Sequence, residues 1–172
     1  MKRYFTLLQS IFLIRTVKPW FSNRIKRLMK SEKLYLLDTG LLSHLLGQTP
    51  ERLERDPAAG ALLENFVAAE LMKQRECSRI RPEIYHFRDY EGIEVDLVLE
   101  APGGQKLVGI EVKSRATIDT NDFRGLRTMA EALGDTFHRG VVLYSGEQVI
   151  PFGQKLHALP IQALWTMRWS ET

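Results

Sequence analysis

The chain has 172 residues, of which 44% are hydrophobic and 26% are charged, a size that fits one medium domain or one domain with a small appendage. Its single cysteine, Cys77, excludes an intramolecular disulfide and a thiolate metal site. The apolar runs near the N-terminus are far shorter than the ~20 residues that span a bilayer, so we expect no membrane segment, no targeting signal and a reducing, cytoplasmic setting.

The formal net charge of +3 conceals a basic N-terminal segment. Residues 1–33 contain nine lysines and arginines but a single acid, Glu32, whereas the rest of the chain is net acidic. Such a segment favours a polyanionic partner, although a solvated basic loop that binds nothing explains the charge equally well. The residues predicted to bind nucleic acid are Arg24, Lys26, Arg27 and Lys30.

The elements predicted before residue 57 are short. RYFTLLQSIF has the apolar spacing of a helix, LIRTVKPW looks extended, and KLYLL predicts a strand. Asp38 or Thr39 can cap a short helix, GLLSHLL. The polar span 47–57 holds two prolines, and we expect it to separate a segment at residues 1–47 from a main body at residues 48–172.

The body is predicted to begin with a long helix, AAGALLENFVAAELMKQRE, with Asp56 as its N-cap and Pro57 at its first position. Three strands follow, IYHFR, IEVDLVL and KLVGIEVK, and the turn APGGQ joins the last two as a hairpin. A second helix, which begins at Asp119 or Thr120 and runs to about Leu133, and the strand GVVLYS come next. Because a hairpin is followed by a helical crossover, we expect an α/β fold with a central mixed sheet flanked by helices.

The hairpin carries candidate site residues. Glu111 and Lys113 share a face because residues two apart in a strand point the same way, and pairing through the turn brings Asp96 close to them. Two carboxylates placed together raise each other's pKa unless a cation lies between them. Taken alone, the short Glu-x-Lys motif is better explained as an ion pair at a sheet edge, and it is Asp96, together with a carboxylate on the long helix, that favours a site. The face predicted for Asp96 also holds Glu94 and Val98, and the opposite face holds Ile93, Val95, Leu97 and Leu99.

The long helix adds one further carboxylate. Glu64 shares its helical face with apolar residues such as Ala61 and Val67, and a carboxylate in an apolar stripe is costly unless it is paired or bound to a metal. Glu70 has Lys73 three residues on as a surface partner. We therefore include Glu64 in the candidate site and treat Glu70 as a solvated residue.

This set of residues resembles the site of the PD-(D/E)xK nuclease superfamily, which has a helix glutamate, an acid on one strand (here Asp96) and Glu-x-Lys on the next (here Glu111 and Lys113). The chain departs from that pattern at Val95, where the superfamily name has proline. Four blocks in order, KLYLLDTGL, LLENFVAAEL, VDLVLE and GIEVKS, are similar to the C-terminal region of a family of prokaryotic AAA-type ATPases. In that family a nuclease-like domain of unassigned function follows an ATPase core and a winged helix. The resemblance covers about residues 3 to 165.

The resemblance implies a restriction-endonuclease-like fold at residues 48–172, preceded by a partial winged helix at residues 1–47. The sequence has no G-x-x-x-x-G-K phosphate loop, so we expect this chain to lack the ATPase core. DNA is the implied ligand, and the implied partner is an ATPase, either as a missing N-terminal region or as a separate protein. The sequence leaves open whether the chain forms a homo-oligomer.

The chemistry implied by the resemblance is phosphodiester hydrolysis by a deoxyribonuclease that depends on Mg²⁺ or Mn²⁺. Asp96 and Glu111 would hold the ion, with the backbone carbonyl of Val112 as a further ligand. Lys113 would orient the attacking water or stabilise the transition state, and Glu64 would support or complete the metal site. The alternative is a catalytically inactive module with the same fold that binds DNA or a protein.

Overall fold

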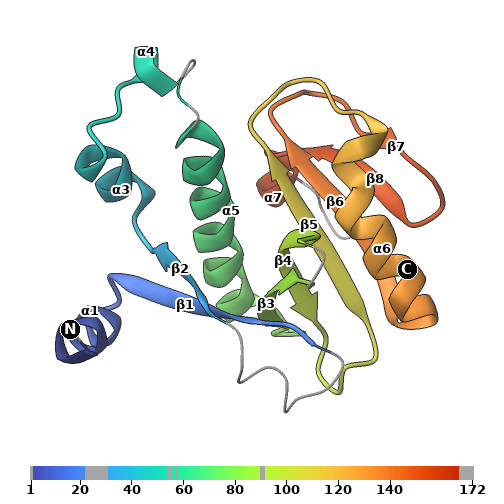
Figure 1. The fold of residues 1–172 in the computed structure, drawn as a ribbon, viewed down its shortest axis with the longest axis horizontal. Coiled ribbons are helices and arrows are strands. Elements are labelled where there is room, and N and C mark those ends of the chain that lie inside the picture. Colours follow the sequence, from blue (N-terminus) through green and yellow to red (C-terminus); the bar gives the residue numbers. More distant parts are fainter. Residues whose placement is uncertain (1, 22–30, 54–55, 57, 90–91, 167–172) are drawn as a thin grey trace.

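A single mixed sheet forms the centre of the computed structural model (Figure 1). The sheet has eight strands, in the order β2-β1-β3-β4-β5-β6-β8-β7. The described residues are 2–21, 31–53, 56, 58–89 and 92–166, so the predicted DNA-binding residues Arg24, Lys26, Arg27 and Lys30 lie outside them. The strands are β1 (Ile14–Pro19), β2 (Lys33–Leu36), β3 (Glu83–Arg88), β4 (Glu94–Glu100), β5 (Leu107–Lys113), β6 (Phe137–Tyr144), β7 (Ile150–Pro151) and β8 (Leu156–Pro160).

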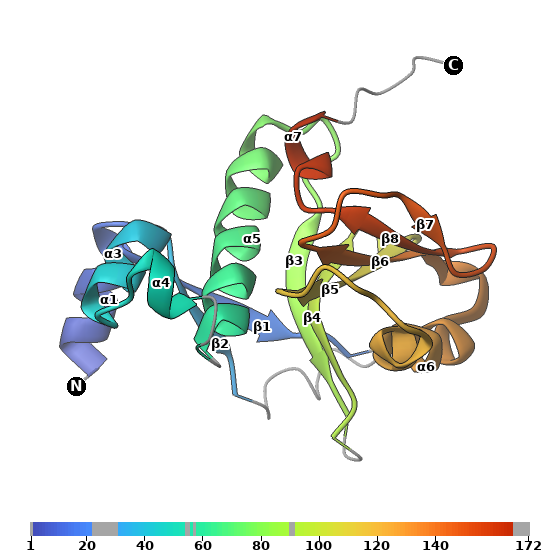
Figure 2. The same cartoon turned by 90° about the horizontal axis from the view of Figure 1, so that it is seen from above.

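Helices lie on both faces of this sheet (Figure 2). The long helix α5 (Ala58–Cys77) packs on one face, where Val67 and Ala68 contribute to a buried cluster with β4 and β5. On the other face, α6 (Arg124–Leu133) buries Leu126 and Met129. No helix in the described part of the chain is long and apolar enough to cross a membrane. The shorter helical elements are α1 (Lys2–Ser10), α3 (Thr39–Leu45), α4 (Pro50–Leu53), η1 (Thr120–Phe123), η2 (Gly134–Thr136) and α7 (Ala163–Thr166).

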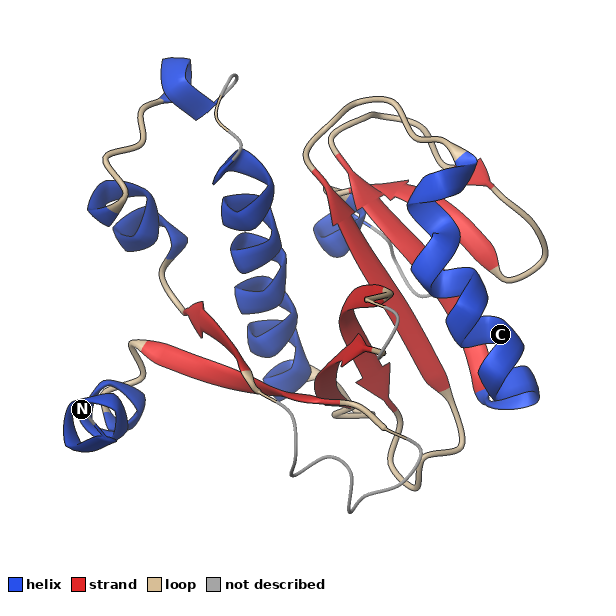
Figure 3. Ribbon diagram, in the orientation of Figure 1, coloured by secondary structure: helices blue, strands red, loops and turns tan. Residues whose placement is uncertain are grey.

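The strand directions confirm the predicted mixed sheet (Figure 3). β3, β4 and β5 are successive antiparallel neighbours, and β5 pairs in parallel with β6 after the crossover through α6. The predicted helix starts also carry their caps: Asp38, Asp56 and Asp119 each accept a hydrogen bond from a main-chain N–H two or three residues on, at 2.8, 2.8 and 2.7 Å. Pro57 lies outside the described residues.

The N-terminal segment contributes two strands to the same sheet. β1 pairs in parallel with β3 through Lys18 and Tyr85, and it pairs antiparallel with β2. Trp20 is buried in the core cluster beneath α6, and its Nε1 donates to Oε1 of Glu100 at 3.1 Å. Through these contacts Trp20 anchors the N-terminal segment in the hydrophobic core. The predicted boundary at 47–57 contains the short helix α4, and both the division into two domains there and the partial winged helix stay predictions.

β4 breaks its regular alternation beside Asp96. Tyr85 pairs with Val98 and Phe87 pairs with Val95, so β3 has one residue between these two pairs and β4 has two. The extra residue in β4 is a β-bulge. Val95 and Val98 therefore both pack in the core under α6, while Leu97 packs on the α5 side. The predicted single apolar face was therefore wrong, because strict alternation does not anticipate an inserted residue. That prediction had placed Ile93, Val95, Leu97 and Leu99 together.

The first turn of α6 lies very close to β4. A Cβ atom at Gly125 would lie 2.2 Å from the carbonyl oxygen of Glu94 and 3.2 Å from Oε1 of Glu111. A main-chain carbonyl cannot move aside as a side-chain tip can, so this approach requires glycine. Gly60 in α5 is a useful contrast, because the nearest atom to a Cβ there is Oγ of Ser114 at 3.9 Å.

We expect Gly125→Ala to lower the free energy of unfolding by about 2 kcal/mol or more, because α6 must move away from β4. The matched control Gly60→Ala should be neutral or stabilising by up to about 1 kcal/mol, because alanine is the better helix former and has room there. Urea denaturation of both variants measures the difference. Equal stability of the two variants would contradict the close approach of α6 to β4.

Candidate functional site

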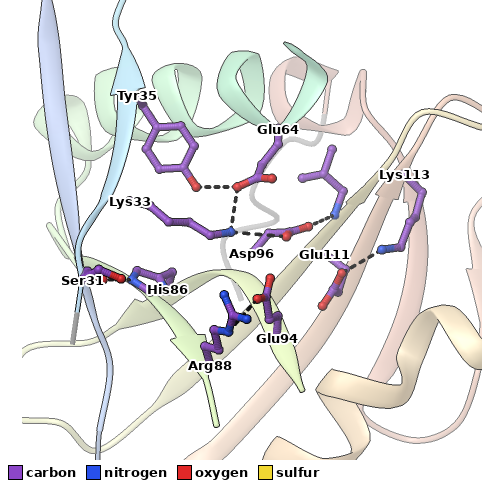
Figure 4. A network of polar contacts seen from close by, with 11 residues as sticks. Ser31, Lys33, Tyr35, Glu64, His86, Arg88, Glu94, Asp96, Glu111 and Lys113 are labelled. Carbon is purple, nitrogen blue, oxygen red and sulfur yellow. Dashed lines mark hydrogen bonds and ion pairs between the residues drawn. The ribbon is translucent and has the colours of Figure 1, made fainter. Parts of the chain in front are cut away.

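Charged side chains from β2, α5, β4 and β5 meet beside the bulge (Figure 4). Nζ of Lys33 lies 2.9 Å from Oε1 of Glu64 and 3.6 Å from Oδ1 of Asp96. On β5, Nζ of Lys113 lies 2.9 Å from Oε2 of Glu111. The structure thus brings together the four residues predicted from the sequence, and it adds Lys33 to them.

Asp96 links the two halves of this cluster. Its Oδ2 accepts a hydrogen bond of 2.9 Å from the main-chain N–H of Val112. The β4–β5 ladder runs from Glu100 to Leu97 on β4, so the carboxylate takes over as the partner of β5 where β4 bends away. The N–H and C=O of a strand residue point to the same neighbour, which directs the Val112 carbonyl toward the same side. Its role as a metal ligand stays a prediction.

Glu64 is paired, as a carboxylate in an apolar stripe must be. Its Oε1 accepts hydrogen bonds from the Tyr35 hydroxyl at 2.6 Å and from Nζ of Lys33 at 2.9 Å. Tyr35 is itself buried. Glu70 pairs with Lys73 at 2.6 Å, as predicted, but only 16% of its side chain is exposed, so it is not the solvated residue that the sequence predicted.

Lys33 and Tyr35 are not among the residues predicted for the site. A signal was available, because two polar-tipped residues two apart in the strand KLYL share a face. Lys33 was counted only as part of the basic segment. Which helix that strand face meets depends on long-range packing, so the pattern alone does not connect it to Glu64.

Burial and repulsion raise the pKa of both strand carboxyls. The pKa of Glu111 rises to about 8, first because of burial and then because of the charge of Asp96, while Lys113 opposes the shift. The pKa of Asp96 is raised by burial and by the charge of Glu64, against the opposing effects of Lys33 and the Val112 N–H. At neutral pH the pair therefore holds a proton that a bound cation would displace.

Both lysines stay charged. Burial lowers the pKa of Lys33, but its hydrogen bond to Glu64 and the charge of Glu64 more than offset that effect, so the pKa lies above its usual value. The pKa of Lys113 is likewise raised overall, because Glu111 outweighs the effect of burial. The cluster consequently alternates negative and positive groups across the end of the sheet.

An open pocket of about 380 Å³ exposes one side of the cluster. Asp96, Glu111 and Lys113 line this pocket, together with Asn121 of η1 and Arg124 at the start of α6. The side that faces solvent thus offers carboxylate ligands for a cation next to an arginine suited to an anion.

Other polar groups at the rim have simpler roles. Glu94, which was predicted to share a face of β4 with Asp96, pairs with Arg88 at 3.0 Å, and both side chains are exposed. His86 is buried, and its Nε2 lies 3.2 Å from the Ser31 carbonyl oxygen. His86 is therefore a packed residue of β3 in this structure.

The donor set fits a small site for one hard cation. Within the described residues, no group of three or more His, Cys, Asp or Glu side chains could hold a metal ion. Asp96 and Glu111 form a two-carboxylate pair, and Mg²⁺ commonly binds one or two carboxylates while water and phosphate complete its shell. The raised pKa of both carboxyls is the expected property of such a pair without a cation.

The fold and site define an α/β protein with an eight-stranded mixed sheet and a charged pocket at the end of β4 and β5. A family model described as "Domain of unknown function (DUF4143)" matches residues 59–164. A second model, "Domain of unknown function (DUF8612)", matches residues 1–52. The chain belongs to the DUF4143 family. Its matched region contains Glu64, Asp96, Glu111 and Lys113, whereas Lys33 lies in the region of the second model.

Two curated relatives are similar to nearly the whole chain. The uncharacterized proteins Mb2031c of Mycobacterium bovis and Rv2008c of Mycobacterium tuberculosis are each 33% identical to it over 168 residues. This match covers 96% of the chain and 35% of each relative, so the chain spans about a third of their length. No solved structure matches the chain.

We expect stability to fall as pH rises, and Glu111 to be the main cause. The folded carboxyl keeps its proton up to about pH 8, whereas the unfolded one releases it near 4.5. The contribution of protonated Glu111 to the free energy of unfolding is therefore complete below pH 4.5 and is lost as pH rises through about 8. Thermal melts without metal should show Glu111→Gln to be at least about 3 °C more stable than wild type at pH 8.5 and much closer to it at pH 5.

Glu131→Gln, which alters an exposed acid of α6, should follow the wild-type pH dependence. If Glu111→Gln loses stability with pH as steeply as wild type, the proton is not held at Glu111.

Proposed function

We propose that this chain is a nuclease-like domain that hydrolyses phosphodiester bonds of DNA with Mg²⁺ or Mn²⁺, on a restriction-endonuclease-like fold. The observation that carries this proposal is a pair of carboxyls on neighbouring strands, the partly buried Asp96 and the buried Glu111, with Lys113 beside them and an open pocket in front. Two carboxylates and a lysine at such a position are suited to binding a metal ion and the phosphate that it activates.

The residues that would hold the ion are Asp96, Glu111 and the carbonyl of Val112. The bound ion would supply a water of lowered pKa and would neutralise charge on the phosphate. Glu111 must lose its proton to act as a ligand, so metal affinity should increase as pH approaches about 8.

Lys113 would act on the reacting groups directly. Its ammonium group has three N–H donors, and one of them is directed to Oε2 of Glu111 at 2.9 Å. The remaining donors can orient the attacking water or stabilise negative charge on the phosphate in the transition state. Arg124, which also lines the pocket, would hold a neighbouring phosphate of the DNA strand.

We also propose that this domain works with an ATPase, as the AAA-type resemblance implies. The two curated relatives extend well beyond the matched region, which leaves room in them for another domain. The ATPase association remains a proposal for the whole protein.

A second candidate function is a binding module that has the nuclease fold without turnover. The ion pairs Lys33–Glu64 and Lys113–Glu111 favour it, because they stabilise the carboxylates without a metal. In that case the basic surfaces would bind DNA, and the site residues would contribute to stability alone.

Cleavage of supercoiled plasmid and branched DNA with Mg²⁺ or Mn²⁺ tests the first proposal. We expect Asp96→Asn to abolish cleavage and Lys113→Met to slow it by about 10²-fold or more, because a donor at the transition state is lost. Glu131→Gln should cleave like wild type. Equal activity of wild type, Asp96→Asn and Lys113→Met would indicate a contaminating nuclease and end the proposal.

Salt dependence of DNA binding, measured without divalent ions, tests the electrostatic contacts. We expect the Kd for a duplex to rise steeply with salt, because bound phosphates release counterions. Arg124→Glu should raise the Kd and flatten the salt dependence, as should joint reversal of Arg24, Lys26 and Arg27. Binding that is indifferent to salt and to these changes would count against DNA as the ligand.

A further inference from the structure

Lys33 comes from outside the nuclease-like region, yet its ammonium lies within the acidic cluster (Figure 4). It is 2.9 Å from Oε1 of Glu64 and 3.6 Å from Oδ1 of Asp96, and about a quarter of its side chain is exposed. The ammonium is thus shared between two carboxylates on different elements, α5 and β4.

β2 is held against α5 independently of Lys33. The side chain of Asn65 accepts a hydrogen bond from the Leu36 N–H and donates another to the Leu36 carbonyl, each at 2.9 Å. The Tyr35 hydroxyl adds a bond of 2.6 Å to Glu64. Since these contacts already attach the strand, the reach of Lys33 past Glu64 to Asp96 calls for a separate explanation.

The electrostatic setting supplies that explanation. Asp96 lies between two acids, Glu64 on the α5 side and Glu111 on β5. Besides burial, the charge of Glu64 raises the pKa of Asp96, and the charge of Asp96 raises the pKa of Glu111. A cation on each side of Asp96 would offset both repulsions. On the Glu111 side lies the open pocket with Lys113 at its wall, whereas on the Glu64 side the cation is the Lys33 ammonium.

We infer that Lys33 is a built-in counter-ion whose ammonium fills a cation position between Glu64 and Asp96, so that a divalent ion can enter this position only when Lys33 is removed. The inference rests on the proposed metal site. Lys33 is then a positioning residue: it holds Asp96 in place for the ion at the Asp96–Glu111 pair and restricts the natural protein to one divalent ion.

The test measures Mn²⁺ binding to the full chain at pH 8.5 by titration calorimetry and electron paramagnetic resonance. Wild type should bind one Mn²⁺. Lys33→Met keeps the length of the side chain but removes its charge, and this variant should bind two Mn²⁺ ions with a spin-coupled signal. Tyr35→Phe removes a neighbouring contact to Glu64 but leaves the ammonium, so it should still bind one ion.

The double variant Lys33→Met/Glu64→Gln guards against misfolding, because it also removes the Glu64 charge that Lys33→Met leaves without its ammonium partner. It should bind one ion, and Mn²⁺ should raise its melting temperature less than that of Lys33→Met. If Lys33→Met does not fold without metal, recovery of its fold by Mn²⁺, with no such dependence in the double variant, supports the inference.

The outcomes separate the two proposals. One ion in wild type and one in Lys33→Met overturns the role of Lys33 but leaves the Asp96–Glu111 site. A third result is that wild type binds no ion, Lys33→Met binds one, and the double variant loses that ion again. This result supports the counter-ion role of Lys33 and overturns the Asp96–Glu111 metal site. Two ions in wild type overturn the inference, and no ion in any variant overturns both.

Discussion

The main constraint on this protein is the close approach of carboxyl groups where β4 begins and β5 ends. Asp96 lies where the bulge ends the β4–β5 ladder, and its carboxylate takes the Val112 N–H that a main-chain partner would otherwise occupy. Glu64 and Glu111 flank it from two sides. Each acid then needs a hydrogen-bond donor or a cation, and the surrounding structure provides these groups.

The N-terminal segment provides much of that compensation on the α5 side. β2 brings Lys33 and Tyr35 to Glu64, and Asn65 fixes the strand to the helix. The regions matched by the two family models are therefore joined through the site as well as through the sheet. The N-terminal segment therefore contributes directly to the charged cluster on β4 and β5.

The elements that the sequence predicted well are those with strong local signals. The capped long helix, the hairpin and the crossover follow from N-cap residues, a turn rich in proline and glycine, and regular apolar spacing. The bulge in β4 was not predicted, because an inserted residue leaves no mark in a short apolar run. The packing of Val95 with Val98 and the close approach of α6 at Gly125 depend on it and on neighbouring elements.

The sequence by itself determined which residues carry charge in otherwise apolar elements: Glu64, Asp96, Glu111 and Lys113. Burying a charged group without a partner is costly, so charged residues in core elements indicate that they are paired with one another or with a bound ion. Only the tertiary structure decided how they are compensated, since the partner of Glu64 is 31 residues away in the chain on another strand. Electrostatic pairing acts through space, and its distances are set by the packing of the sheet against its helices.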